Sequence, residues 1–335
     1  MRRQIALAST LSLLASAATW LGAGTPSAIA SPSPPSPTYS FYMGTTDQTT
    51  LYNLGLSFGG LVAAGKRPQD SVVILDWGDA YCTSTTCGTL LETTGSPFAS
   101  TLAEREASQQ FAYGFWKGTG ADTSAFMDLS MGTTNHGSWF SNSSNSYHNA
   151  YFHGWNWANM ITDANTWLQT NGYSSQVEMR AGIDAELDWS NFSAANAWAN
   201  GYLSKWTSYY YDYGDAAGCP PYGGCDNGWS QYDVWDMSWG VTPAEPIPEI
   251  YNNANAQEWG QIADYSWDSQ TMNMHFYGSM SQYQACLDTN NACTGVDDTP
   301  NQSWTQLYDN LNCSTDCPTP QTPQWSTDIR WKLYA

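Results

Sequence analysis

The amino-acid sequence predicts an α/β protein, a single (β/α)8 barrel of the TIM type with disulfide-pinned loops. Eight apolar, β-prone runs recur along the 335 residues, and residues with helical spacing fill most of the intervals between them. Strands that alternate with helices over this length are typical of a parallel barrel. Eight cysteines lie in four close pairs, which suits short covalent loops at the surface.

The expected strands are nearly continuous in apolar character, as strands covered on both faces should be. They span residues 39–45, 71–78, 125–133, 177–189, 232–240, 248–253, 272–280 and 326–333. The expected helices span residues 47–66, 103–117, 147–171, 198–206, 252–262 and 304–311. The Gly/Pro-rich residues 211–231 read as a loop near the barrel mouth. A doubly wound open sheet is the alternative, but no GxGxxG or GxxxxGK motif follows any strand.

Three segments organise the chain. Residues 1–30 predict a secretory signal peptide, because Arg2 and Arg3 precede an apolar run and small residues follow at 28–30. We expect residues 31–38 to form a Pro/Ser-rich tether and residues 39–335 to form one barrel domain. No later apolar run approaches membrane-spanning length. We therefore expect a secreted, extracellular protein.

The charge of the chain excludes several classes of partner. Without Arg2 and Arg3, eight basic residues stand against 30 acidic ones, a net charge of −22. Such a charge repels phosphate backbones and anionic lipid head groups. We expect no nucleic-acid partner, no membrane partner and no cofactor, and a monomer that binds a neutral ligand.

The cysteines predict disulfides and no metal. An exported protein with an even number of cysteines is typically disulfide-bonded. The close pairs are Cys82 and Cys87, Cys219 and Cys225, Cys286 and Cys293, and Cys313 and Cys317. Zinc is the competing interpretation, but no pair has CxxC spacing and no His-x3-His motif accompanies them. Pairing within each close pair is the simplest connectivity, and other pairings remain open.

The stretch GIDAELDW carries the main chemical signal. If the strand continues through it, Asp184, Glu186 and Asp188 point to one side, at the strand end where barrel active sites lie. Crowded carboxylates cannot all ionise, so one should hold a proton near neutral pH. A protonated acid beside an ionised one is the pair of groups that catalyses glycoside hydrolysis. The structural alternative is capping of the next helix, for which Asp188 or Ser190 is suited.

Other polar and aromatic residues at the expected strand ends are candidates for substrate binding. Acids within apolar runs suggest a ring of carboxylates, and flat aromatic faces suit the apolar faces of sugar rings. These candidates are Asp76, Asp128, Asp236, Trp77, Trp189, Trp239, Tyr251, His275 and Tyr277. The chain has no GxSxG elbow and no unpaired cysteine to act as a nucleophile.

The segment GIDAE, residues 182–186, resembles the Asp-x-Glu signature that closes the fourth strand of family 25 glycoside hydrolases, the lysozyme-type muramidases. PEIYNNANAQEWGQIA is similar to the sixth strand and following helix of that family, and PQWSTDIRW to its terminal segment. The resemblance implies a (β/α) barrel in which Glu186 is the proton donor and Asp184 assists. The family's first strand carries an Asp, which residues 39–45 lack.

These observations predict a secreted glycoside hydrolase that cleaves a polysaccharide, such as a cell-wall glycan, by carboxylate acid/base catalysis. The seventh expected strand carries no acid, which favours substrate assistance or an inverting water. One alternative is an inactive barrel that binds carbohydrate or a cell-surface partner. Another is an exported structural protein, in which Asp184 and Glu186 would lie apart and solvated.

Overall fold

The computed structural model describes residues 32–137, 140, 146–205, 208–241, 243–290, 293–312 and 320–332. Residues Pro34–Ala335 form one compact unit. The predicted signal peptide lies outside the described residues, as do Cys313 and Cys317. In the described part of the chain, no helix is long and apolar enough to cross a membrane.

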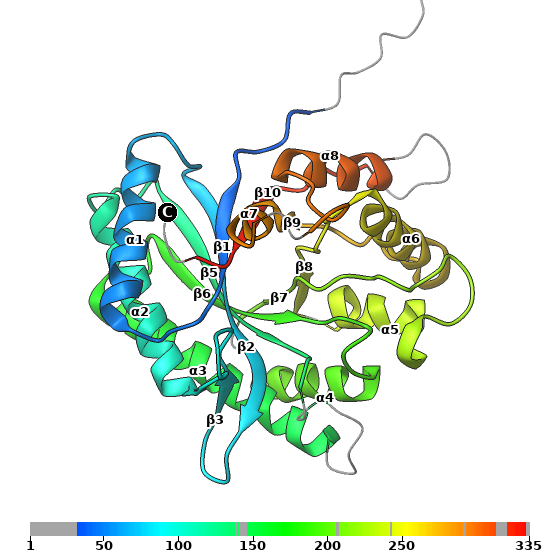
Figure 1. The fold of residues 1–335 in the computed structure, drawn as a ribbon, viewed down its shortest axis with the longest axis horizontal. Helices are drawn as coiled ribbons and strands as arrows, with labels where there is room; N and C mark the ends of the chain where they lie inside the picture. The colour runs from blue at the N-terminus through cyan, green and yellow to red at the C-terminus, as the bar shows by residue number, and fades with distance from the viewer. Residues whose placement is uncertain are drawn as a thin grey trace, which may run out of the picture. The chain divides into compact units, whose positions relative to one another are not determined.

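Eight parallel strands form a nearly closed barrel (Figure 1). They are β1 (Thr38–Tyr42), β2 (Asp70–Cys82), β5 (Phe126–Thr134), β6 (Val177–Asp184), β7 (Tyr210–Asp212), β8 (Ala244–Pro246), β9 (Gly278–Ser281) and β10 (Trp325–Arg330). Their order in the sheet is β8-β7-β6-β5-β2-β1-β10-β9, so strands that follow one another along the chain are neighbours. Backbone hydrogen bonds join the ends, since Met280 N donates to Pro248 O at 2.9 Å and Ile250 N donates to Met280 O at 2.8 Å.

Helices surround the strands (Figure 1). The described residues contain α1 (Gln48–Ala63), α2 (Thr101–Gly118), α3 (Ser146–Asn171), α4 (Phe192–Leu203), α5 (Gln231–Trp235), α6 (Asn253–Gln270), α7 (Tyr283–Asp288) and α8 (Pro300–Leu311). Polar side chains start several of them: Asp47 caps α1, Ser100 caps α2 and Asn252 caps α6 by accepting hydrogen bonds from backbone N–H groups of the first turn.

The strands bury one face inside the barrel and the other against the helices. On β2, Val72 and Ile74 belong to an apolar cluster inside the barrel, with Tyr211 and Ile329 from other strands. The alternate residues Val73, Leu75 and Trp77 belong to the larger cluster shared with the helices. Asp76 therefore continues the inner face of β2, because side chains alternate along a strand.

The prediction of a fifth strand at residues 232–240 is wrong. This segment forms α5 and a π-helical turn, η2 (Asp236–Gly240). Its start carries a capping box in which the Ser230 side chain accepts a hydrogen bond from Asp233 N while the Asp233 side chain accepts one from Ser230 N. The fifth barrel strand is instead β7, which begins before the expected loop 211–231.

The remaining strands differ from expectation mainly in their bounds. The sixth, expected at 248–253, is β8, and residues 248–250 extend it only through hydrogen bonds to Met280. The seventh, expected at 272–280, begins at Gly278. A short hairpin adds β3 (Cys87–Leu90) and β4 (Phe98–Ser100) beyond the end of β2.

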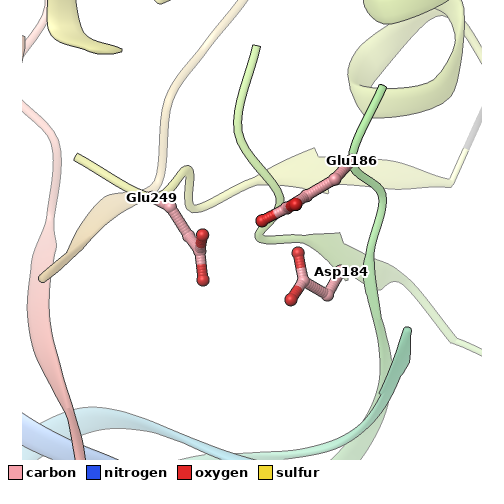
Figure 2. Close-up of side chains that lie close together, drawn as sticks. All are labelled: Asp184, Glu186 and Glu249. Carbon is pink, nitrogen blue, oxygen red and sulfur yellow. The ribbon is translucent and has the colours of Figure 1, made fainter. Parts of the chain in front are cut away.

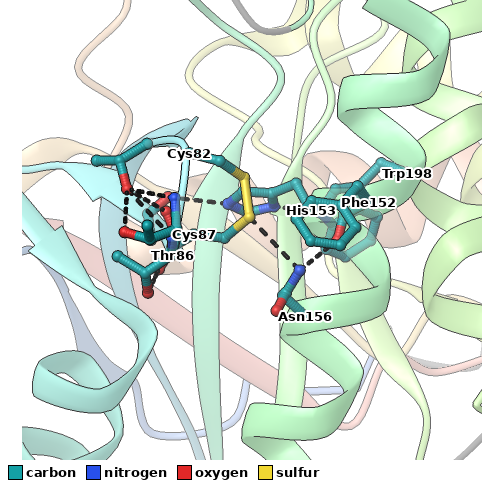
Figure 3. The surroundings of a disulfide bond; sticks show 10 residues. Cys82, Thr86, Cys87, Phe152, His153, Asn156 and Trp198 are labelled. Carbon is teal, nitrogen blue, oxygen red and sulfur yellow. Dashed lines mark hydrogen bonds between the residues drawn. A yellow bond between two sulfur atoms is a disulfide. The ribbon is translucent and has the colours of Figure 1, made fainter.

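Three of the four expected disulfides lie within the described residues and pair as the spacing suggests: Cys82–Cys87, Cys219–Cys225 and Cys286–Cys293. Figure 3 shows the first, which closes the β2–β3 hairpin against α3. There His153 lies between two partners: Trp198 Nε1 donates to its Nδ1 at 3.0 Å, and its Nε2 lies 2.9 Å from the carbonyl of Gly88. Burial lowers the pKa of His153 to about 4, so the ring stays neutral and joins the helix layer to the hairpin.

Two acids outside the barrel mouth are buried as well. Burial raises the pKa of Glu104, on α2, from 4.5 to about 8 and that of Asp212, on β7, from 3.8 to about 7. The Glu104 carboxyl accepts a hydrogen bond from Thr89 Oγ1 at 2.8 Å. Both groups therefore hold their protons more tightly in the folded protein than in the unfolded chain.

We expect the melting temperature to rise as the pH is lowered from 8 to 6.5. A raised carboxyl pKa favours folding below the unfolded value, and this contribution is lost as pH rises towards the folded value. Below pH 6.5 protonation of His153 in the unfolded chain opposes the trend. Circular dichroism melts across this window measure the slope.

Glu104→Gln mimics the neutral acid and should flatten that slope. Glu106→Gln, which changes a partly exposed acid on the same helix, should leave the slope unchanged. A melting temperature that falls as the pH is lowered from 8 to 6.5 would contradict the prediction.

Candidate active site

Three carboxyl groups meet at the carboxyl end of the barrel strands (Figure 2). Asp184 is the last residue of β6, Glu186 follows two positions later, and Glu249 follows β8. One carboxylate oxygen from each residue lies within 4.8 Å of those of the other two. The alternative of an exported structural protein, with Asp184 and Glu186 apart and solvated, does not describe this arrangement.

Asn135, just beyond β5, positions Glu186. The expected strand 177–189 ends at Asp184, yet Asn135 continues the ladder with its side chain: its Oδ1 accepts from Glu186 N at 3.0 Å and its Nδ2 donates to Glu186 O at 2.8 Å. The side-chain amide of Asn135 thus takes the place of the two backbone hydrogen bonds that a neighbouring strand would make with Glu186. Helix α4 begins after Asn191, whose side chain accepts a hydrogen bond from Ala194 N at 3.0 Å. The cap is therefore neither Asp188 nor Ser190, the two residues that the sequence suggests.

The three acids are poorly solvated. Asp184 and Glu249 are each 1% exposed, and Glu186 is half-buried. Burial, followed by repulsion within the cluster, raises the pKa of Asp184 and Glu249 well above their usual values. Burial, with repulsion from Asp215 and Asp188, raises the pKa of Glu186 to about 8, and a hydrogen bond shared with Glu249 partly offsets this. Glu186 therefore keeps its proton at neutral pH.

No basic side chain of the described residues forms an ion pair with these three acids. Shared protons and a hard divalent cation are the two ways in which such a set can be neutralised. The hydrogen bond between Glu186 and Glu249 is the proton-sharing arrangement. The oxygen Oδ1 of Asp184 is buried and accepts no hydrogen bond from the described residues.

Asp76 and three tyrosines, Tyr42, Tyr213 and Tyr251, surround the cluster. Burial, with repulsion from Glu92, raises the pKa of Asp76 to about 7, and Gly78 N donates to its Oδ1 at 2.7 Å. The hydroxyl groups of Tyr213 and Tyr251 interact with Asp76 and Glu249 and lower the pKa of each. Tyr213 fits inside the barrel because Gly132 and Gly182 leave room, since a Cβ at Gly132 would lie 2.1 Å from the tyrosine oxygen.

A cavity of about 280 Å³ opens beside the cluster, with Asp184 in its wall. The described residues that line it are Tyr42, Asp79, Glu92, Thr134, His136, Asp184, Trp189 and Trp331. The rings of Tyr42 and Trp331 lie 4.4 Å apart, centroid to centroid, and those of His136 and Trp189 lie 5.3 Å apart. Aromatic faces and carboxyl groups thus share one hollow.

The structure brings together five of the residues that the sequence singles out for a site: Asp184, Glu186, Asp76, Trp189 and Tyr251. The others lie elsewhere. Trp77 is fully buried between β2 and the helices, so its ring faces away from the barrel interior. Asp236 and Trp239 lie in η2, and Trp239 packs edge-on against His275 with ring centroids 5.7 Å apart.

Asp128 and Tyr277 lie towards the amino end of the strands. Asp128 pairs in register with Glu178, six residues before the level of Asp184, or about 20 Å along the strand. Its carboxylate forms a 3.0 Å ion pair with Arg180 and accepts a hydrogen bond from Tyr211 at 2.8 Å. Tyr277 interacts with Glu245, another partner of Arg180. These groups form an ion-pair network inside the barrel.

Glu249, Asn135 and Tyr42 are parts of the site that the sequence analysis missed. Glu249 stands in the run PEIYNN, two positions before Tyr251, so alternation along a strand places both on one face. An acid inside an apolar run is unusual, so the position of Glu249 in this run could have marked it as a candidate site residue. No sequence pattern marks Asn135, because its role depends on contact with a segment 51 residues away.

Comparison with known proteins finds no family model, curated protein or solved structure that matches this chain.

Proposed function

We propose that this protein is a glycoside hydrolase with a (β/α)8 barrel of the TIM type, which cleaves a polysaccharide by carboxylate acid/base catalysis. The observation that carries the proposal is the convergence of Asp184, Glu186 and Glu249 beside an aromatic-lined cavity at the carboxyl end of the strands. Paired carboxyl groups perform this chemistry, and aromatic faces hold sugar rings. The resemblance of residues 182–186 to family 25 glycoside hydrolases agrees with it.

Glu186 is the proton donor in this proposal. With a pKa of about 8, it carries a proton at neutral pH that can pass to the glycosidic oxygen as the bond to the leaving sugar breaks. Asp184 lines the cavity and faces the developing positive charge. That charge favours the ionised form of Asp184, because an opposite charge nearby stabilises a carboxylate.

Glu249 acts through Glu186. It is buried, shares a hydrogen bond with Glu186 and repels the charge of Asp184. It therefore helps to keep Glu186 oriented. In this proposal Glu249 is a positioning residue, and Asp184 and Glu186 are the catalytic pair.

The spacing of the acids favours retention of configuration. Inverting enzymes separate their carboxyl groups by about 6.5–9.5 Å to admit a water molecule between them. Here the nearest oxygens of the three acids lie within 4.8 Å of one another. We accordingly prefer a retaining reaction, with Asp184 or a group of the substrate stabilising the intermediate, to the inverting water.

Secretion is part of the same proposal. Three disulfides in the described residues fit an extracellular protein, since disulfides persist in oxidising compartments. The acidic chain, with a net charge of −20, is suited to a carbohydrate partner and repels nucleic acids and anionic membranes.

The test is a screen of the purified protein against peptidoglycan, chitin with and without its acetyl groups, and α- and β-glucans for release of reducing ends. We expect cleavage of at least one glycan, with the anomeric configuration retained in the first product seen by NMR and with no loss of activity in EDTA. Saturable binding without product across the panel would instead support the inactive, carbohydrate-binding barrel. If the protein neither binds nor cleaves any glycan of the panel, the hydrolase and the carbohydrate-binding barrel are both rejected.

A further inference from the structure

The wall of the cavity is acidic. Asp79 and Glu92 line it together with Asp184, while the described lining includes no Lys or Arg. Among the described lining residues, His136 is the one titratable base, and its Nδ1 lies 2.9 Å from Asp79 Oδ1. Three carboxyl groups therefore face at most one positive charge.

A bulge in β2 sets the direction of Asp79 and leaves room for Glu92, which follows β3. The pairing of β2 with β5 shifts register between Asp76 and Asp79, a bulge that changes the direction of Asp79. Gly78, in this bulge, has a φ of 93°, and a Cβ there would lie 3.2 Å from Glu92 Oε1 and 2.4 Å from the carbonyl of Leu90. Only a glycine lets the Glu92 loop approach this closely.

The acids that line the cavity favour a positively charged ligand. Asp184 is 1% exposed and its Oδ1 accepts no hydrogen bond from the described residues, although the residue lines the cavity. A neutral sugar that displaced water from the half-buried Asp79 and Glu92 would leave their carboxylates without a compensating charge, which is costly. An ammonium group would pair with these carboxylates and donate a hydrogen bond to Oδ1 of Asp184. The rings of Tyr42, Trp189 and Trp331 add aromatic faces that attract cations.

We propose that the cavity binds a glycan with free amino groups, built of hexosamine units without acyl groups, and that Asp79 and Glu92 recognise the ammonium group. This inference rests on the proposed function, because it names the substrate class of the same site. It changes the neutral ligand that the sequence suggests into a cationic one. The net charge of −20 would steer such a polymer to the protein.

Binding of glucosamine oligomers and of N-acetylglucosamine oligomers of equal length to the Glu186→Gln variant tests the inference. By calorimetry we expect the free-amine oligomer to bind at least about tenfold more tightly, as one charged hydrogen bond allows. Asp79→Asn and Glu92→Gln, each added to Glu186→Gln, should weaken this binding about tenfold while changing that of the acetylated oligomer little. Asp309→Asn, an exposed acid on α8, is the matched control and should change neither.

A second measurement needs no change in the cavity wall. Added salt should weaken binding of the free-amine oligomer and leave that of the acetylated oligomer nearly constant, because salt screens charge. Equal or tighter binding of the acetylated oligomer would overturn the inference, as would the absence of salt dependence.

The two proposals can fail separately. Glu186-dependent cleavage of neutral glycans without preference for amines would leave the hydrolase standing and reject amine recognition. Selective binding of the free-amine oligomer without cleavage by the unsubstituted protein would retain amine recognition and reject the hydrolase.

Discussion

Glu186→Gln is expected to lower kcat for glycan hydrolysis by about 10²- to 10⁴-fold, the usual contribution of a general acid, while substrate binding stays close to its original strength. The amide has the shape of the protonated carboxyl group but cannot deliver its proton. In the unsubstituted protein, activity should fall as pH rises through about 8, where Glu186 loses that proton. Initial rates of reducing-end release across this pH range measure both effects.

Asp188→Asn is the matched control for that experiment. Asp188 is exposed and its charge raises the pKa of Glu186. Its removal should keep the maximal rate and move the alkaline decline to lower pH, because less repulsion opposes ionisation of Glu186. Turnover by the Glu186→Gln variant at the original rate would remove Glu186 from the mechanism.

Arg180→Met is expected to destabilise the protein by about 3–5 kcal/mol, the cost of breaking a buried ion pair from one side. Arg180 forms ion pairs with Asp128 at 3.0 Å, Glu178 at 3.3 Å and Glu245 at 3.7 Å, and its side chain is 15% exposed. Without it, Asp128 and Glu245 remain buried with uncompensated charge. Urea unfolding at neutral pH gives the difference in the free energy of unfolding.

Arg105→Met is the control for the network. Arg105 pairs with Asp163, whose side chain is 61% exposed, so its loss should cost less than about 1 kcal/mol. The destabilisation by Arg180→Met should shrink at acidic pH, where Asp128 and Glu245 can take up protons. A cost equal to that of Arg105→Met would show that the network adds nothing to stability.

The order of strands and helices was predictable where elements are long. Strands β2, β5 and β6 have eight or more residues, enough for an apolar run to stand out, and α1, α2 and α3 show their spacing clearly. Strands β7 and β8 have three residues each, too few for any periodic signal. The aromatic run 232–240 then took the place of β7 in the prediction, although the Ser230 and Asp233 capping box marked a helix start.

The candidate site was predictable in part for a similar reason. Asp184 and Glu186 are close in sequence and were found together, whereas Glu249 joins them only because β8 and β6 both end at the barrel mouth. Asp128 looked equivalent to Asp76, since both are acids within apolar runs. Its place near the start of β5 pairs it with Arg180 at the other end of the strands.

By itself, the sequence determined the α/β alternation and one pair of acids, and it favoured the three local disulfide pairings that the structure shows. Each of these features depends on residues that are near neighbours along the chain. The tertiary structure decided which acids meet, which aromatic rings line the cavity and which acid Arg180 neutralises. Those outcomes depend on strand register and on which end of a strand a residue occupies, and contacts between distant segments set both.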